Sequence, residues 1–124
     1  MTVLYSEKLL DHFRHPRNHG TLIDPDVSHE SFNPLCGDRI RIELKLENNQ
    51  VKEARFRGDG CAISIAAASL LTGLLPGRTV QEPVSNDELL AALESDIKPA
   101  RIQCALLALE ALRAGLKDHD QRDS

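Results

Sequence analysis

Hydrophobic and polar residues alternate most regularly in the middle of the chain. From residue 39 to residue 47 every second residue is aliphatic, which is the period-two pattern of a strand with one buried face. After a turn at Asn48-Asn49, the segment 51–57 continues the alternation and returns along the first strand. The glycine-rich stretch 58–60 is expected to end this second strand. The pattern therefore predicts an antiparallel hairpin.

Other segments have apolar residues at helical spacing, together with helix start and stop signals. We expect helices over residues 6–13 and 61–75, over residues 85–93, and from Pro99 onwards, the last with Ile102, Leu106, Leu109, Leu112 and Leu116 along one face. Ser6 can cap the first helix, and Ser85 with Glu88 forms a capping box for the third. The polar end of the chain, residues 118–124, is expected to be frayed.

Strands that come before most of the helices are typical of an α+β domain. A third, short strand is expected over residues 27–32, so the sequence predicts a three-stranded antiparallel sheet with helices packed on one face. With 124 residues, residues 1–124 are expected to form one domain with its own core. Because the chain has three Phe and no Trp, that core has to be aliphatic.

The charge and the cysteine count exclude several classes of protein. A formal net charge of −4 argues against a nucleic-acid-binding surface, which usually needs a basic stripe. The N-terminus has no signal-peptide pattern, and the longest apolar stretch, 61–75, is shorter than the ~20 residues that cross a membrane. Three cysteines are an odd number, which makes a disulfide framework improbable. We therefore expect a cytoplasmic protein with no membrane contact.

The three cysteines, Cys36, Cys61 and Cys104, share a local setting. Each lies in a polar turn or in the first turns of a helix, where backbone N–H groups and the helix dipole favour thiolate. Asp38 follows Cys36 by two residues, so on an extended backbone both side chains point the same way. Cys36 and Cys61 border the same end of the predicted hairpin, and a docked helix could bring Cys104 there. Three thiolates and one carboxylate would form a tetrahedral metal site.

The opposite interpretation is that the cysteines are inert core residues. Free cysteine is among the most buried residue types and usually behaves as a small hydrophobe. The chain also has no CxxC pair, so the usual zinc-finger signal is absent. Spacing and pattern alone leave both interpretations open.

Four segments of the chain resemble the IscU/SufU/NifU N-terminal family of iron–sulfur cluster assembly proteins. They are DHFRHPRNHG (residues 11–20), NPLCGDRIRIELKL (33–46), GDGCAISIAAASLLTGLLPG (58–77) and KPARIQCALLALEAL (98–112), and they occur in the family's order. The resemblance implies the α+β fold of that family. It also implies that Cys36, Asp38, Cys61 and Cys104 hold zinc or a nascent [2Fe–2S] cluster.

The resemblance further implies sulfur transfer. A pyridoxal-phosphate-dependent cysteine desulfurase of the SufS/IscS type would present a persulfide, and the family's acceptor position corresponds to Cys104. Clusters built at the site would pass to iron–sulfur client proteins. Arg101, three residues before Cys104, is expected to stabilise the negative charge of the site from outside the ligand set. An ordinary surface arginine is an equally good interpretation of Arg101.

Within this family the sequence is most similar to the SufU branch, with two kinds of departure. Gln103 replaces the histidine that precedes the third cysteine in the IscU branch, and residues 98–101 differ from that branch's chaperone-recognition segment. The extra segment that SufU-type proteins carry between their second and third cysteines is missing. The chain is therefore SufU-like in sequence but IscU-like in length.

Two roles outside sulfur transfer have to be weighed. A zinc hydrolase would need an open coordination position and a nearby base, but four protein ligands leave no open position. The five histidines also lie away from the cysteine motifs in sequence and are expected at the surface. A purely structural zinc site is the stronger alternative, because closed four-ligand sites are typical of structural zinc.

Overall fold

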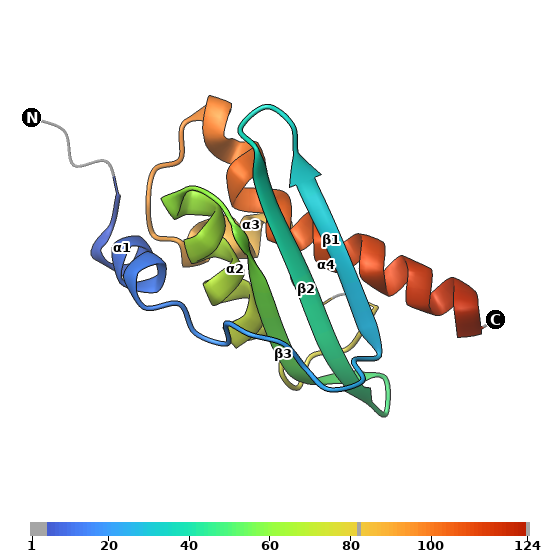
Figure 1. Ribbon diagram of the computed structural model, residues 1–124. Helices are drawn as coiled ribbons and strands as arrows, with labels where there is room; N and C mark the ends of the chain where they lie inside the picture. The colour runs from blue at the N-terminus through green and yellow to red at the C-terminus, as the bar shows by residue number, and fades with distance from the viewer. Residues whose placement is uncertain (1–4, 82, 124) are drawn as a thin grey trace, which may run out of the picture.

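Three antiparallel strands form one sheet in the order β1-β2-β3. The computed structural model describes residues 5–81 and 83–123. The strands are β1 (Val27–Asn33), β2 (Asp38–Glu47) and β3 (Gln50–Asp59), and the helices are α1 (Glu7–Arg14), α2 (Ala62–Leu74), α3 (Asn86–Ala92) and α4 (Ile102–Asp123), the last preceded by a 3-10 turn at Pro99–Arg101 (Figure 1). The predicted α+β class and three-stranded sheet are confirmed.

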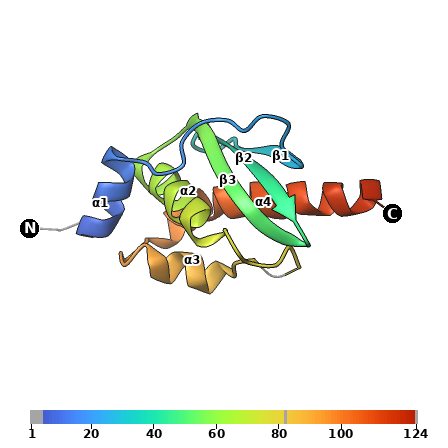
Figure 2. The ribbon, with the colours of Figure 1, turned by 90° about the horizontal axis from the view of Figure 1, so that it is seen from below.

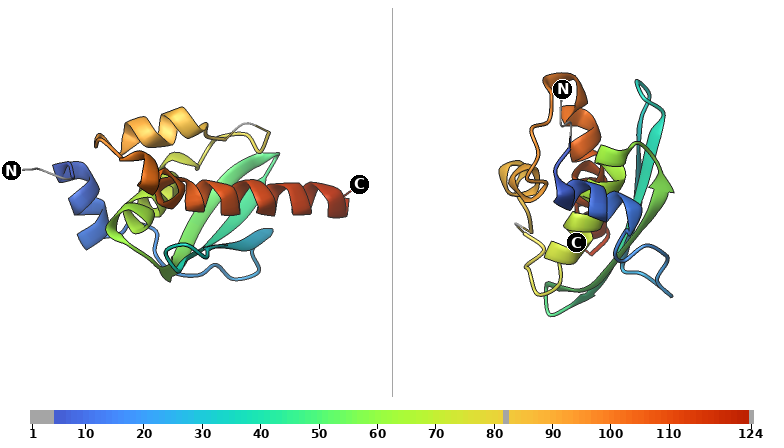
Figure 3. Two further views of the ribbon diagram at one scale, coloured as in Figure 1. Left: turned by 90° about the horizontal axis from the view of Figure 1, so that it is seen from above. Right: turned by 90° about the vertical axis from the view of Figure 1, so that its left-hand side faces the viewer.

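The helices lie on one side of the sheet, as Figures 2 and 3 show. The alternating aliphatic residues of β2, among them Ile40 and Ile42, are fully buried, and so is Phe56 of β3. Helices α2 and α4 both contact the sheet, whereas α1 packs against α2 and α3 packs against α2 and α4. Because α2 has buried residues around most of its circumference, it forms the centre of the core.

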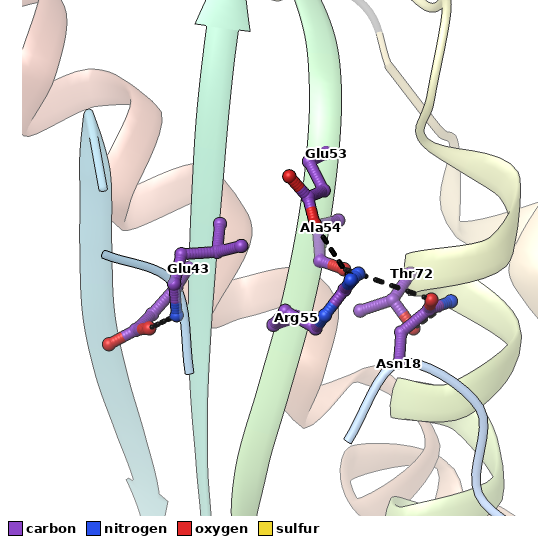
Figure 4. A network of polar contacts seen from close by, with 7 residues as sticks. Asn18, Glu43, Glu53, Ala54, Arg55 and Thr72 are labelled. Atoms are coloured by element: carbon purple, nitrogen blue, oxygen red, sulfur yellow. Dashed lines mark hydrogen bonds and ion pairs between the residues drawn. The ribbon is translucent and has the colours of Figure 1, made fainter. Parts of the chain in front are cut away.

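The segment between α1 and β1 covers the free edge of β3 and part of the other face of the sheet. The Phe56 N–H donates to Asn18 O at 3.0 Å, and the Gly20 N–H donates to Phe56 O at 2.8 Å. Figure 4 shows the Asn18 side chain between Arg55 of β3 and Thr72 of α2. Further along, the Leu22 N–H donates to Glu43 Oε1 at 2.8 Å, which leaves Glu43 only 6% exposed.

The strand and helix boundaries differ from the sequence predictions in three places. Strand β3 ends at Asp59, inside the stretch 58–60 that was expected to end it, but it runs two residues beyond the predicted segment 51–57. It can continue through Gly58, which has φ +152°, because glycine lacks the Cβ that would lie 2.0 Å from Arg39 O at this position. Cys61 is the N-cap of α2 and not its first residue. Helix α4 continues to Asp123, so most of the segment expected to be frayed is helical. Among the described residues, no helix has both the length and the apolar character needed to cross a membrane.

Candidate metal centre

Cys36 lies in the turn between β1 and β2. The Gly37 N–H donates to Asn33 O at 2.8 Å, the Leu35 N–H donates to the Asn33 side chain at 3.0 Å, and Gly37 has φ +76°. Because this turn projects from the sheet, Cys36 is exposed. Asp38 begins β2 opposite Asn33, and its side chain is only 5% exposed. One tight turn therefore presents an exposed thiol beside a buried carboxyl.

Cys61 lies at the same end of the sheet, after β3. Asp59, two residues earlier, pairs with Arg39 of β2, so the end of β3 and the start of β2 are neighbours. Cys61 has the extended backbone of an N-cap (φ −76°, ψ 173°), but its side chain makes no capping hydrogen bond. The half-buried thiol is therefore not used by the helix that it precedes.

Cys104 comes from the first turn of α4, after the 3-10 turn at Pro99–Arg101. It is only 3% exposed, and its Sγ lies 3.6 Å from Cys36 Sγ. Burial, followed by contacts with Cys36 and Cys61, raises the pKa of the Cys104 thiol to about 12. Cys104 is thus buried against another thiol, and not in aliphatic packing alone.

The ligand atoms of Cys36, Asp38 and Cys104 all lie within 4.8 Å of one another. Cys61 borders this group, because its thiol contacts the Asp38 carboxyl and Cys104. The four candidate ligand residues of the sequence analysis are therefore neighbours at one end of the sheet, although the tightest group contains three of them.

The Asp38 carboxyl has several contacts at the site, but one of its two oxygen atoms lacks a hydrogen bond. Burial would raise its pKa, but contacts from the thiols of Cys36 and Cys61, from Ser64 and from the Cys61 backbone outweigh burial, and the pKa is lowered. Its Oδ2 is nevertheless buried without a hydrogen bond, the only such side-chain nitrogen or oxygen in the described part of the chain. A buried ionised oxygen beside three sulfur atoms suits a cation, and thiolate and carboxylate are ligands that zinc and iron accept.

Comparison with known families agrees with this geometry. The family model described as the NifU-like N-terminal domain matches residues 4–124. The chain belongs to this family. The match spans the whole sheet, all four helices and the cysteine site, so no part of the fold described above lies outside the NifU-like domain.

Relatives of this NifU-like domain include members of both branches named in the sequence analysis. The zinc-dependent sulfurtransferase SufU of Bacillus subtilis is 36% identical over 135 aligned positions, which cover 94% of this chain and 91% of SufU. The iron–sulfur cluster assembly scaffold protein IscU of Azotobacter vinelandii is 36% identical over 122 positions, which cover 95% of each protein. The alignment with SufU has more positions than this chain has residues, so SufU contains residues that have no counterpart here. This agrees with the IscU-like length of the chain.

A crystal structure of SufU from Fervidobacterium islandicum has the same fold as this NifU-like domain. The TM-score is 0.80 at 23% identity, and the match covers 91% of this chain and 96% of the other. At this identity the similarity of the two structures establishes the fold of the chain. The chemistry of the site depends on the residues of this chain.

Two residues that shape the site of the NifU-like domain were missed in the sequence analysis. Ser64 is fully buried, donates to Cys61 O at 3.1 Å and contacts the Asp38 carboxyl. A Cβ on Gly60 would lie 2.1 Å from Ser64 Oγ and 3.3 Å from Asp38 Cγ, so a larger residue here would have to displace one of these side chains. The available signal was the spacing, because Ser64 follows Cys61 by one helical turn.

The structure places Arg101 and Gln103 differently with respect to the site. Arg101 contacts the Cys61 thiol, and this contact, together with the charges of Cys61 and Cys104, raises the pKa of the Arg101 guanidinium. Gln103 lines a shallow hollow of about 310 Å³ beside Phe32 and Leu35. Arg101 therefore contacts a thiol of the site, whereas Gln103 lies beside Phe32 and Leu35.

Proposed function

We propose that this NifU-like domain accepts sulfur as a persulfide from a pyridoxal-phosphate-dependent cysteine desulfurase at a site of three cysteines and one aspartate, and supports the building or transfer of [2Fe–2S] clusters. The observation that carries the proposal is the convergence of three thiols on a buried carboxyl oxygen without a hydrogen bond. Relatives named as a zinc-dependent sulfurtransferase and as a cluster assembly scaffold support it.

The proposed metal ligands are Cys36, Asp38, Cys61 and Cys104. A zinc ion held there would supply positive charge that keeps the thiols deprotonated and ordered. The cluster is cargo, and three cysteines with one oxygen ligand hold it less firmly than four cysteines would. Asp38 is the harder ligand of the four and is therefore the one that we expect to exchange most easily.

Exposure suggests which thiol meets the donor first. The sequence resemblance assigns the acceptor to Cys104, and that assignment stays a prediction. Cys104 is 3% exposed, however, whereas Cys36 lies in an open turn. Because a persulfide on another protein has to reach its acceptor, we propose that Cys36 receives the sulfur and that Cys104 acts after it.

We propose that Arg101 is a positioning residue. Its guanidinium contacts the Cys61 thiol and is itself exposed, so it can favour the thiolate form without occupying a ligand position. We expect Arg101→Gln to slow the alkylation of Cys61, because the positive charge beside its sulfur is lost, and mass spectrometry of the 58–78 peptide after alkylation measures the change. Arg101→Lys should restore part of the effect because it keeps the charge. Identical alkylation profiles in all three proteins would contradict this role.

Three free thiols at one site suit a reducing compartment, because oxidising compartments favour disulfides. We therefore place the proposed function in the cytoplasm. Desulfurase and iron–sulfur client proteins are the expected partners there.

The decisive experiment supplies a cysteine desulfurase and L-cysteine to the full chain and maps persulfides by mass spectrometry. Trypsin separates the three cysteines, which fall in the peptides 18–39, 58–78 and 102–113. An added sulfur atom on the 18–39 peptide supports the proposal, and one on the 102–113 peptide alone would restore the Cys104 assignment. No persulfide on any of the three peptides would overturn the proposed sulfur transfer.

Addition of ferrous iron to the same mixture separates the two roles within the family. A stable visible absorption of a [2Fe–2S] cluster indicates a scaffold. Retained zinc with faster desulfurase turnover and no cluster indicates sulfur transfer without scaffolding.

A purely structural zinc site is the second candidate, because four protein ligands form a closed site. Cys104→Ser distinguishes the two candidates. If the site is functional, this variant keeps its far-ultraviolet circular dichroism and still receives sulfur on Cys36, but the steps that follow the Cys36 persulfide are impaired. If the zinc is structural, the variant unfolds, since structural zinc contributes directly to the folding free energy.

A further inference from the structure

The Sγ atoms of Cys36 and Cys104 lie 3.6 Å apart in the thiol site. That separation is close to the ~3–3.5 Å at which reacting atoms are poised for attack. The two thiols also differ in accessibility, since Cys36 is exposed and Cys104 is buried. Cys36 can therefore meet an external sulfur donor, while Cys104 lies beside Cys36 and out of the donor's reach.

We propose that Cys36 and Cys104 act as a dithiol pair that reduces sulfane sulfur to sulfide. The inference rests on the proposed function, because it begins with a persulfide on Cys36. The Cys104 sulfur attacks the inner sulfur of that persulfide, which is the Cys36 Sγ itself. A Cys36–Cys104 disulfide forms, the bond between the two sulfur atoms of the persulfide breaks, and the outer sulfur leaves as hydrosulfide.

Atoms and electrons balance in this step. The sulfane sulfur gains two electrons and becomes sulfide, while the two cysteine sulfurs together lose two electrons. The proton of the Cys104 thiol leaves with hydrosulfide as hydrogen sulfide. An external dithiol reductant then returns the disulfide to two thiols. Because bridging sulfur in a [2Fe–2S] cluster is sulfide and persulfide sulfur is not, cluster building needs this two-electron reduction.

The local structure favours attack at the inner sulfur. An outer sulfur on Cys36 can extend towards solvent because the turn that carries Cys36 is exposed, which leaves the buried side of Cys36 Sγ facing Cys104. Hydrosulfide is the conjugate base of a stronger acid than an ordinary thiol, and a better leaving group speeds thiol–disulfide exchange.

The turn can also supply the movement that a disulfide needs. A disulfide bond is about 2.05 Å long, so the sulfurs have to approach by roughly 1.5 Å. Cys104 is held in the first turn of α4, and the approach falls to Cys36. Gly37, with φ +76° and no atom within 4 Å of its missing Cβ, leaves room for this turn to adjust.

The test loads the full chain with inorganic polysulfide, removes the excess by desalting, and follows sulfide and disulfide together. We expect one hydrogen sulfide for each disulfide between the peptides 18–39 and 102–113, with a first-order rate constant that does not change over a tenfold range of protein concentration. The full chain is used both as purified and after chelator treatment. We expect faster release after chelation, because a bound ion competes for the thiolates.

Two variants provide the matched comparison. Cys104→Ser should slow loss of the Cys36 persulfide by at least about tenfold, given the large effective concentrations of well-placed groups. After chelator treatment, when the proposed ligand role of Cys61 does not affect the result, Cys61→Ser removes a neighbouring thiol but should still form the Cys36–Cys104 disulfide. If Cys104→Ser does not fold, the peptide mapping of the unmodified chain still decides the matter.

Several results would overturn the thiol-pair proposal. They are sulfide release without that disulfide, a disulfide mainly to the 58–78 peptide, movement of the extra sulfur to the 102–113 peptide, or an apparent first-order rate constant that rises in proportion to protein concentration. Polysulfide loading does not involve a desulfurase. A chain that fails to receive sulfur from a desulfurase would therefore count against the proposed function, and the polysulfide experiment would still test the thiol pair.

Discussion

At the residue scale, Gly60 sets how closely Ser64 and Asp38 can approach. The three nearest atoms that a Cβ at this position would meet belong to the side chains of Ser64 and Asp38 at the cysteine site. Ser64 is fully buried and cannot turn towards solvent, so an added methyl group has to displace it or the carboxyl. The shape of the site therefore depends on a residue that supplies no ligand.

We expect Gly60→Ala to lower the free energy of unfolding by about 1–3 kcal/mol, the usual cost of overpacking. It should also weaken cobalt(II) binding, because Asp38 would be displaced. Urea unfolding and the visible spectrum of the cobalt complex measure the two effects. Gly73→Ala is the matched control, since no atom lies within 4 Å of its Cβ and alanine favours a helix. Equal spectra for both variants would contradict the expected role of Gly60.

His12 links α1 to α2 through its contact with Ser69. Its Nδ1 lies 2.7 Å from Ser69 Oγ, which also accepts the Arg17 N–H at 2.8 Å. Burial, and then the charge of Arg17, lower the pKa of His12, so the folded state favours the neutral ring. Histidines were expected only at the surface, because a spacing pattern does not show that a serine of another helix lies opposite.

A group whose folded pKa is depressed stabilises the protein above its unfolded pKa, and that contribution is lost as pH falls through the folded value. We therefore expect the free energy of unfolding to fall as pH drops below about 6.5. His12→Gln should reduce this slope because it removes the titrating group. Urea unfolding between pH 5 and 8 measures the slope. Parallel curves for the two proteins would show that His12 does not cause it.

At the element scale, the polar ends of strands and helices were harder to predict than their apolar centres. The centre of β2 was predicted correctly because buried aliphatic residues alternate with polar residues along its sequence. The stretch 58–60 was correctly expected to end β3, but the continuation through Gly58 to Asp59 was not predicted, because it depends on the close approach of Gly58 to the Arg39 carbonyl. The end of α4 was not predicted, since a polar segment can extend a helix whose earlier turns pack against β1.

Helix α1 is tied to the end of α3 by its own N-cap. Ser6 Oγ accepts from the Leu9 N–H at 3.0 Å and donates to Leu93 O at 2.7 Å, and the Ser6 N–H donates to Ser95 Oγ. Ser85 caps α3 through the Glu88 N–H alone, in an exposed position. One hydroxyl therefore serves two helices, whereas the other serves one.

We expect Ser6→Ala to lower the free energy of unfolding by about 1.5–2.5 kcal/mol, because a cap and a second hydrogen bond are both lost. Ser85→Ala, the matched control, should cost about 1 kcal/mol. Chemical denaturation followed by circular dichroism measures both values. A smaller effect for Ser6→Ala than for Ser85→Ala would contradict the double role.

At the scale of the whole molecule, the candidate site joins parts of the chain that are far apart in sequence. Cys36 and Asp38 come from the β1–β2 turn and the start of β2, Cys61 from the start of α2, and Cys104 from the start of α4. The sequence indicated this convergence because the hairpin register brings two of these places together. It could not give the burial of Cys104 or its separation from Cys36, since both depend on how α4 packs.

An ion bound at such a site has to stabilise the folded chain, because the unfolded chain does not hold these groups together. At a free zinc concentration 100 times the dissociation constant, we expect a gain of about 2.7 kcal/mol, or roughly 10 °C in the melting temperature. Asp38→Asn should lose most of this gain, because it removes the charge of the one buried oxygen without a partner in the described part of the chain. Asp59→Asn removes an equal charge from an exposed position at the same end of the sheet and should keep the gain. Thermal unfolding with zinc and with a chelator measures the difference, and equal shifts in the two variants would mean that the ion binds elsewhere.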